Sequence, residues 1–228
     1  MPPRAARAAP VKEPRKVPAH ERVHAKLRGM ILFGELQPGQ AVTLHGVAER
    51  LGAGLTPVRE SIRQLTAEGA LVLRDNRRVC VPRLSCDQVD QLALTRLAVE
   101  PAMAARAVGR MSDDDIATLE DLDARLDAAI AADDVQSYLW ANCRFHFTFY
   151  EASQADFLLA ITRVAWLRFG PSLRMVFARL DTSNVPDQHG RAIAALRAGD
   201  REGVAAALES DIREGLGQLR TALRDAAD

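Results

Sequence analysis

The sequence predicts a mainly α-helical protein, in which an N-terminal winged helix-turn-helix with a small β-hairpin wing precedes a C-terminal antiparallel bundle of about six helices. One basis for this prediction is the segment 47–65, which has the pattern of two short helices joined by a glycine-containing turn. Another is a pair of short β-type runs that follows this segment. The last is the composition after residue 85, where Ala, Leu, Glu, Asp and Arg dominate and no segment is convincing as a strand.

The N-terminal part begins with a stretch that has little to bury. Residues 1–18 are rich in Ala, Pro, Arg and Lys, so we expect a disordered basic tail. From about His20 the pattern becomes helical, with an apolar stripe formed by Val23, Leu27, Met30 and Ile31. This helix is expected to stop at Gly34, before a turn at Pro38-Gly39.

The second helix of the segment 47–65 has one apolar and one cationic face. We expect it to begin at Thr56-Pro57, because Thr is a good N-cap and Pro is favoured at the first helical position. Its apolar face consists of Val58, Ile62 and Leu65. Arg59 and Arg63, one turn apart, project from another face. This arrangement, braced by a shorter helix, is typical of a helix-turn-helix that reads double-stranded DNA.

Two β-type runs, 71–74 and 79–81, flank a polar tip that contains Arg77 and Arg78. An ordinary hairpin is one interpretation, but two arginines at the tip favour a wing that contacts phosphate or the minor groove. We therefore predict a winged helix-turn-helix domain over residues 19–82. A short linker over 83–87 would follow.

The rest of the chain, residues 88–226, is predicted to form the all-helical domain. We expect its helices at roughly 86–109, 112–131, 134–153, 155–180, 186–198 and 200–225. Ser112 predicts an N-cap, since three acidic residues follow it at a positive helix end. Ala198-Gly199-Asp200 predicts the end of one helix and the start of the next.

The charge of the chain is divided unevenly between its two parts. Residues 1–84 hold 15 Lys or Arg against 7 Asp or Glu, a net charge of +8, and the remaining 144 residues hold 15 against 23, a net charge of −8. This split indicates that only the front part meets a polyanion.

Composition excludes other classes of protein. No apolar run approaches a membrane span, and the N-terminus has no apolar core of a secretory signal. The three cysteines lack metal-type spacing, which indicates reduced thiols and a cytoplasmic protein.

Several motifs, in order along the chain, carry a resemblance to a known family. They are Leu32-Phe33-Gly34-Glu35-Leu36-Gln37-Pro38-Gly39, Thr56-Pro57-Val58-Arg59-Glu60, Arg96-Leu97-Ala98-Val99-Glu100-Pro101, Phe145-His146 and His189-Gly190-Arg191-Ala192-Ile193. From about His20 to Leu223 the chain resembles GntR-type bacterial transcription regulators of the FadR-like branch, whose C-terminal FCD-type domain is all-helical. The apparent six helices resemble the VanR-type subgroup. The resemblance implies a homodimer on a palindromic operator, a small organic acid as effector, and repression that the effector relieves.

One departure from the family concerns base readout. Relatives usually have a small polar residue and an arginine before the Thr-Pro pair, where this chain has Gly54 and Leu55. The missing arginine typically contacts a base, so the DNA sequence preference of this chain is either altered or relaxed. The candidate DNA contacts that remain are His45, Thr56, Arg59, Arg63, Arg77 and Arg78.

A second group of residues predicts a metal site. Asn142 and His146 are four residues apart on a predicted helix and share a face, while His189 and Asp211 lie on two later helices. The resemblance implies an Asp/Asn-His-His-His site, with Asp211 in place of the third histidine. Such a set suits Zn²⁺, Ni²⁺ or Mn²⁺ and leaves positions open for a ligand carboxylate. The alternative is a packed His146 and a solvent-facing Asp211.

Arg96 also allows two interpretations. A guanidinium can bind the carboxylate of an effector, and it can instead form a salt bridge with Glu100 four residues on.

Two rival functions stay open at this point. In one, the helical domain only dimerises and has lost its effector site. In the other, it is a metal-dependent enzyme, but the predicted ligands come with no obvious separate base, nucleophile or oxyanion hole.

Overall fold

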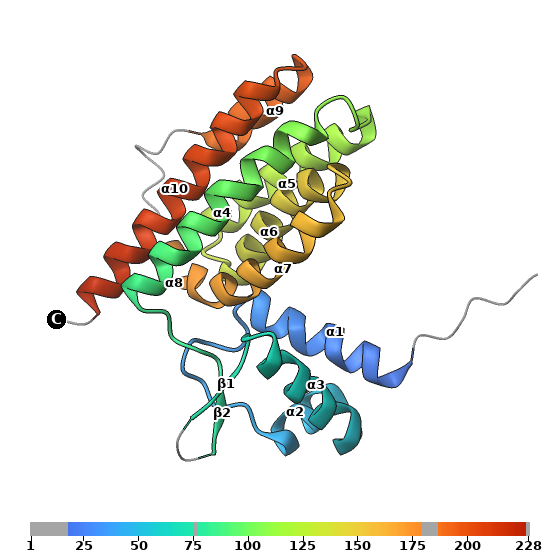
Figure 1. Cartoon of the computed structure of the whole chain (residues 1–228), viewed down its shortest axis with the longest axis vertical. Helices are drawn as coiled ribbons and strands as arrows, with labels where there is room; N and C mark the ends of the chain where they lie inside the picture. Colours follow the sequence, from blue (N-terminus) through green and yellow to red (C-terminus); the bar gives the residue numbers. More distant parts are fainter. Residues whose placement is uncertain (1–17, 75–76, 179–186, 227–228) are drawn as a thin grey trace, which may run out of the picture.

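The computed structural model describes residues 18–74, 77–178 and 187–226. Figure 1 shows two groups of elements: a bundle of long helices, and a smaller group of short helices and a hairpin at one end of it. Residues 1–17 of the predicted tail (1–18) and the tip residues Asp75 and Asn76 lie outside the described part of the chain, as do residues 179–186 and 227–228.

The smaller group consists of α1 (Ala19–Leu32), α2 (Leu44–Leu51), α3 (Leu55–Ala67), β1 (Val72–Leu73) and β2 (Val79–Cys80). The two strands pair antiparallel, with Val72 opposite Cys80 and Leu73 opposite Val79. A bridge between Ala41 and Cys80 extends this small sheet. The winged helix-turn-helix predicted from the sequence is therefore confirmed.

The start of α3 differs from the expected Thr56-Pro57. The helix begins at Leu55 with Gly54 as its N-cap, and no side chain caps it. Pro57 occupies the third helical position, which is still in the first turn. Backbone N–H groups there have no partner within the helix, so proline does not require the helix to start beside it.

The loop between α2 and α3 depends on a left-handed residue. Gly52 ends α2 with φ of 58°, a conformation that glycine adopts without the steric cost of a side chain. At the other end of α2, the Thr43 hydroxyl accepts a hydrogen bond from the Gly46 N–H at 3.1 Å. These two ends fix the short helix that braces α3.

The bundle consists of α4 (Cys86–Ala107), α5 (Asp113–Ala131), α6 (Val135–Ala152), α7 (Asp156–Phe169), the 3₁₀ turn η1 (Gly170–Ser172), α8 (Leu173–Phe177), α9 (Gln188–Arg197) and α10 (Arg201–Asp225). Ser112 caps α5 through a capping box, as predicted. Gly199, with φ of 68°, separates α9 from α10, which Asp200 caps.

One expected helix in this region is wrong. The single helix expected over 155–180 is broken after Phe169, because Pro171 has no N–H to continue the ladder and the chain tightens into η1. The helix expected from residue 86 does begin there. Ser85 and Gln88 form a capping box, which starts α4 already at Cys86.

The two groups pack against each other through α1. Leu167 of α7 is buried in the same hydrophobic cluster as Leu27 and Ile31 of α1. A Cβ placed on Gly170 would lie 2.4 Å from the Leu32 carbonyl oxygen, so η1 and the end of α1 approach as closely as only glycine allows. Arg28 also donates to the Arg163 carbonyl oxygen at 3.1 Å.

None of the described helices is long and apolar enough to cross a membrane.

Candidate functional site

The face of α3 that points away from the core meets the hairpin at a groove. Val58 and Leu65 are buried beneath it, whereas Arg59 is exposed. A groove of about 580 Å³ is lined by Arg59 and Ile62 of α3, Arg77 and Arg78 of the wing, and residues 41–44. The structure thus brings together three of the predicted DNA contacts from two elements.

The other three predicted contacts lie outside the groove lining. His45 on α2 and Thr56 in the first turn of α3 are exposed. Arg63 is exposed as well, but its Nε donates to Glu60 Oε2 at 3.1 Å. Leu55, where the family resemblance leads us to expect an arginine, is 41% exposed.

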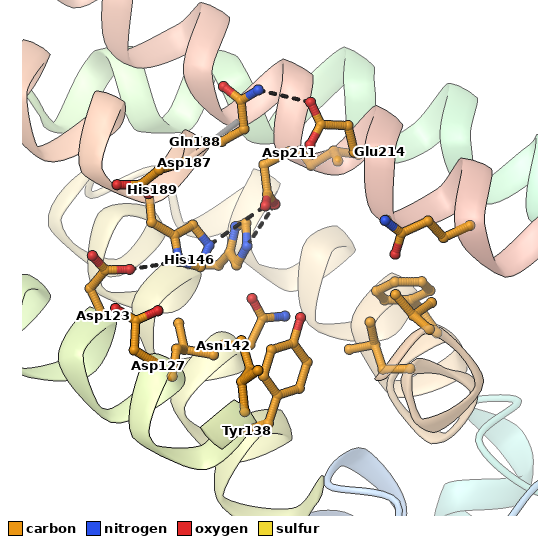
Figure 2. A pocket seen from close by; sticks show the side chains of 18 of the residues that line it. Asp123, Asp127, Tyr138, Asn142, His146, Asp187, Gln188, His189, Asp211 and Glu214 are labelled. Carbon is orange, nitrogen blue, oxygen red and sulfur yellow. Dashed lines mark hydrogen bonds and ion pairs between the residues drawn. The ribbon is translucent and has the colours of Figure 1, made fainter. Parts of the chain in front are cut away.

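The predicted metal ligands come from three helices of the bundle. Asn142 and His146 lie on α6, His189 on α9 and Asp211 on α10. His146 Nε2 lies 3.0 Å from Asp211 Oδ2, and His189 Nε2 lies 3.6 Å from Asp211 Oδ1 (Figure 2). One donor atom from each of these three residues lies within 4.8 Å of the other two. Asn142 is 7% exposed and, together with these three residues, lines a cavity in the bundle.

In each histidine the other ring nitrogen, Nδ1, lies within hydrogen-bonding distance of a second polar side chain. His146 Nδ1 lies 3.0 Å from the Tyr150 hydroxyl, and His189 Nδ1 lies 3.2 Å from Asp123 Oδ1. His189 Nε2 is buried and has no hydrogen-bond partner among the described residues. A buried polar atom without a partner costs free energy unless something binds it.

The electrostatics of this cluster keep Asp211 ionised and act in opposite directions on the two histidines. Burial would raise the pKa of Asp211, but His146 and His189 outweigh it and hold that pKa at about 2. Burial lowers the pKa of His146. Burial also opposes charge on His189, but the hydrogen bond to Asp123 and the charge of Asp211 raise its pKa. Two imidazoles and an ionised carboxylate therefore fit a divalent cation.

A cavity of about 250 Å³ adjoins the cluster, and carboxylates dominate its charge. The acidic residues in its lining are Asp123, Asp127, Asp187, Asp211 and Glu214 (Figure 2). Burial and the charges of Asp123 and Asp187 raise the pKa of Asp127, as expected when carboxylates crowd together.

Arg96 lines the cavity, but its guanidinium already forms hydrogen bonds with a carboxylate. It is 2% exposed, and its Nε and Nη2 donate to the two oxygens of Glu100 at 2.8 and 2.9 Å. Its guanidinium also lies over the rings of Trp166 and Phe169, at 4.6 and 4.5 Å from their centroids. The salt bridge that was one interpretation of the sequence is thus present.

Three contributors were not identified from the sequence: Glu100 as a centre of hydrogen bonds, Tyr150, and Asp123. Tyr150 follows His146 by four residues, a helical spacing that indicates a shared face. Asp123 is 66 residues from His189 on another helix, so no local pattern connects them.

Comparisons with known families match most of the chain. Residues 19–81 match the bacterial regulatory proteins of the gntR family, and residues 91–214 match the FCD domain.

Among individual relatives, the HTH-type transcriptional regulator McbR of Escherichia coli strain K12 is 28% identical over 184 residues, which cover 79% of this chain and 83% of McbR. The HTH-type transcriptional repressor RspR of the same organism is 28% identical over 103 residues, 45% of each chain.

Solved structures agree with these matches. The structure of E. coli McbR/YncC has a TM-score of 0.80 at 26% identity and covers 93% of this chain and 100% of that one. A transcriptional regulator GntR from Rhodococcus sp. RHA1 has a TM-score of 0.69 at 19% identity, covers 88% of this chain and 96% of its own, and shows a likeness of fold alone. These matched proteins are regulators and not enzymes. With both parts matched, the chain belongs to the GntR family of DNA-binding transcription regulators and carries a C-terminal FCD domain.

Proposed function

We propose that this regulator is a repressor that dissociates from DNA when a small organic acid binds in the cavity of the helical domain, next to a bound metal ion. The observation that carries this proposal is the convergence of His146, His189 and Asp211 beside a cavity of about 250 Å³. The domain limits we propose are 19–82 for DNA binding and 88–226 for effector binding and dimerisation. The basic tail 1–18 and the linker 83–87 lie outside them. A cytoplasmic location goes with a protein that acts on bacterial DNA.

On the DNA side, we assign Arg59 to the base edges or backbone of the major groove and Arg77 and Arg78 to phosphates beside it. This assignment is supported by the position of all three arginines in one groove of the protein, between α3 and the wing. We assign His45, Thr56 and Arg63 to the DNA contact as well, because they are exposed on α2 and α3. As a homodimer, the protein would present two such surfaces to a palindromic operator.

On the effector side, His146, His189, Asp211 and Asn142 would hold Zn²⁺, Ni²⁺ or Mn²⁺. When bound, such an ion supplies a positive centre to which a carboxylate of the effector is attracted. Arg96 is held by Glu100 in a buried ion pair, so this role falls mainly to the ion. The crowded carboxylates of the cavity repel an organic acid that arrives without it.

The cavity is connected to the DNA-binding part through η1 and α1. Phe169 and Leu173 line the cavity and lie at the two ends of η1, and η1 packs on α1. A ligand that displaces these two side chains therefore moves the turn against which the end of α1 rests.

The experiment that tests the proposal compares the wild type with His146→Ala/His189→Ala. Protein purified without chelator is analysed for metal, and its binding to the DNA upstream of its own gene is titrated with mono- and dicarboxylic acids. We expect bound metal and acid-induced release for the wild type, and DNA binding with neither property for the double variant. A wild type that neither carries nor binds metal would instead support a helical domain that only dimerises.

A further inference from the structure

Glu100 is the centre of a buried hydrogen-bond network behind the metal cluster. It is 0% exposed, and four donors reach its two oxygens. Oε1 accepts from Arg96 Nε at 2.8 Å and from Trp166 Nε1 at 3.1 Å. Oε2 accepts from Arg96 Nη2 at 2.9 Å and from the Tyr150 hydroxyl at 2.7 Å. An ionised carboxylate offers about four acceptor positions, so all of them are filled.

This network sets the direction of the hydrogen bond between Tyr150 and His146. A tyrosine hydroxyl has one proton, and Glu100 receives it. The Tyr150 oxygen must then accept from His146, 3.0 Å away, so the proton of the neutral imidazole is on Nδ1. The remaining nitrogen, Nε2, presents a lone pair toward Asp211, 3.0 Å away.

Asp123 sets His189 in the same way. Its Oδ1 lies 3.2 Å from His189 Nδ1, and a carboxylate only accepts, so Nδ1 carries the proton. His189 Nε2 is left as a lone pair, buried and without a hydrogen-bond partner in the described chain. It also points toward Asp211 (Figure 2).

When both rings are neutral, two lone pairs and a carboxylate therefore converge with no proton among them, an arrangement that either a proton on a ring or a divalent cation complements. We propose that Glu100, acting through Tyr150, and Asp123 are positioning residues that fix the tautomers of His146 and His189 for metal binding. Arg96 takes part by holding the Glu100 carboxylate in place through two hydrogen bonds. This inference rests on the metal site of the proposed function, but the tautomers it assigns are observable without any metal.

The first test is ¹⁵N NMR of the imidazole rings in metal-free protein, at a pH above the titration of both rings. We expect His146 and His189 each to carry the proton on Nδ1. Tyr150→Phe should release this preference in His146 alone, and Asp123→Asn should release it in His189 alone. A proton found on Nε2 of either ring in the wild type would overturn the inference for that ring, whatever its affinity for metal.

The second test measures the affinity for Zn²⁺ by competition with a chelating dye. Loss of such supporting hydrogen bonds typically weakens a metal site by about 10- to 100-fold, and we expect a loss of this size for Tyr150→Phe and for Asp123→Asn. If the tautomers are as assigned but the wild type does not bind Zn²⁺, Ni²⁺ or Mn²⁺, the metal-dependent function fails while the positioning role stands.

Matched controls separate positioning from general effects on the cavity. Tyr138→Phe removes a hydroxyl from the same cavity lining, and Asp127→Asn removes a charge one helical turn from Asp123. Neither residue hydrogen-bonds to His146 or His189 in the described structure. Both variants should keep the wild-type tautomers, and each should bind Zn²⁺ more tightly than its matched variant. Equal losses in variant and control would overturn the inference.

Discussion

Arg59 and Arg63 lie one turn apart on α3, yet the structure gives them different surroundings. Arg59 faces the groove beside the wing and forms no side-chain hydrogen bond to another described residue. Arg63 lies against Glu60, which hydrogen-bonds its guanidinium and lowers its attraction for a phosphate. The Glu60 pKa is lowered by the same hydrogen bond, so the carboxylate is ionised wherever the protein is folded at neutral pH. Two arginines of the same helix should therefore contribute unequally to DNA binding.

The corresponding prediction is that Arg59→Ala weakens DNA binding by about 1–3 kcal/mol, the range of a specific arginine–base contact. Arg63→Ala should weaken DNA binding less, because the ion pair with Glu60 already neutralises part of the Arg63 charge. Fluorescence anisotropy with the upstream DNA of its own gene measures both. An Arg59→Ala variant with wild-type affinity would remove this side chain from the interface.

At the scale of single elements, the wing is the part whose role is easiest to isolate. It carries Arg77 and Arg78 on a hairpin of two-residue strands, and both arginines are exposed. Replacing both arginines by alanine should leave folding intact and remove contacts with phosphates. Each lost phosphate contact lowers the slope of log K against log salt by roughly 0.9.

We therefore expect the slope to fall by about 1–2 for Arg77→Ala/Arg78→Ala, measured by anisotropy over a series of salt concentrations. Affinity should fall by a similar factor for specific and unrelated DNA. A variant with the wild-type slope would show that the wing does not touch phosphate.

The elements also show how far sequence patterns determine the structure. The apolar stripe of α1, the caps at Ser112 and Asp200, and the hairpin followed from local spacing, because they depend on residues within one or two turns. The break at Gly170-Pro171 was missed, although its proline is a local signal.

The site was predicted in part for the same reason. Its candidate ligands were predicted from the family motifs and from the four-residue spacing of Asn142 and His146. Asp123 and Glu100 were not found in these roles, because their bonds to His189 and Tyr150 cross between helices 66 and 50 residues apart and arise only from packing.

At the scale of the whole molecule, the DNA-binding part and the bundle share a packed contact instead of a flexible joint. Gly170 has φ of −48°, a conformation open to any residue, so alanine there would strain the structure only through the contact with Leu32. Gly217 on α10 is exposed, and a Cβ there would meet nothing within 4 Å.

We predict that Gly170→Ala destabilises the protein by about 1–3 kcal/mol, the usual cost of forcing extra volume into packed structure. Gly217→Ala should be neutral or stabilising by up to about 1 kcal/mol, because alanine favours helix. Thermal unfolding compares the two, and effector titration shows whether Gly170→Ala also weakens the link from cavity to DNA. An unfolding midpoint equal to that of the wild type would mean that η1 and α1 separate readily.

The five carboxylates that line the cavity have a consequence for the logic of regulation under the proposed function. In that proposal an anionic effector meets repulsion until a divalent ion has entered, and it is the acid that displaces the side chains at the ends of η1. The response then requires two chemical inputs in a fixed order, metal first and acid second. Such a regulator reports the availability of the ion together with the abundance of the acid, and stays on its operator when either is scarce.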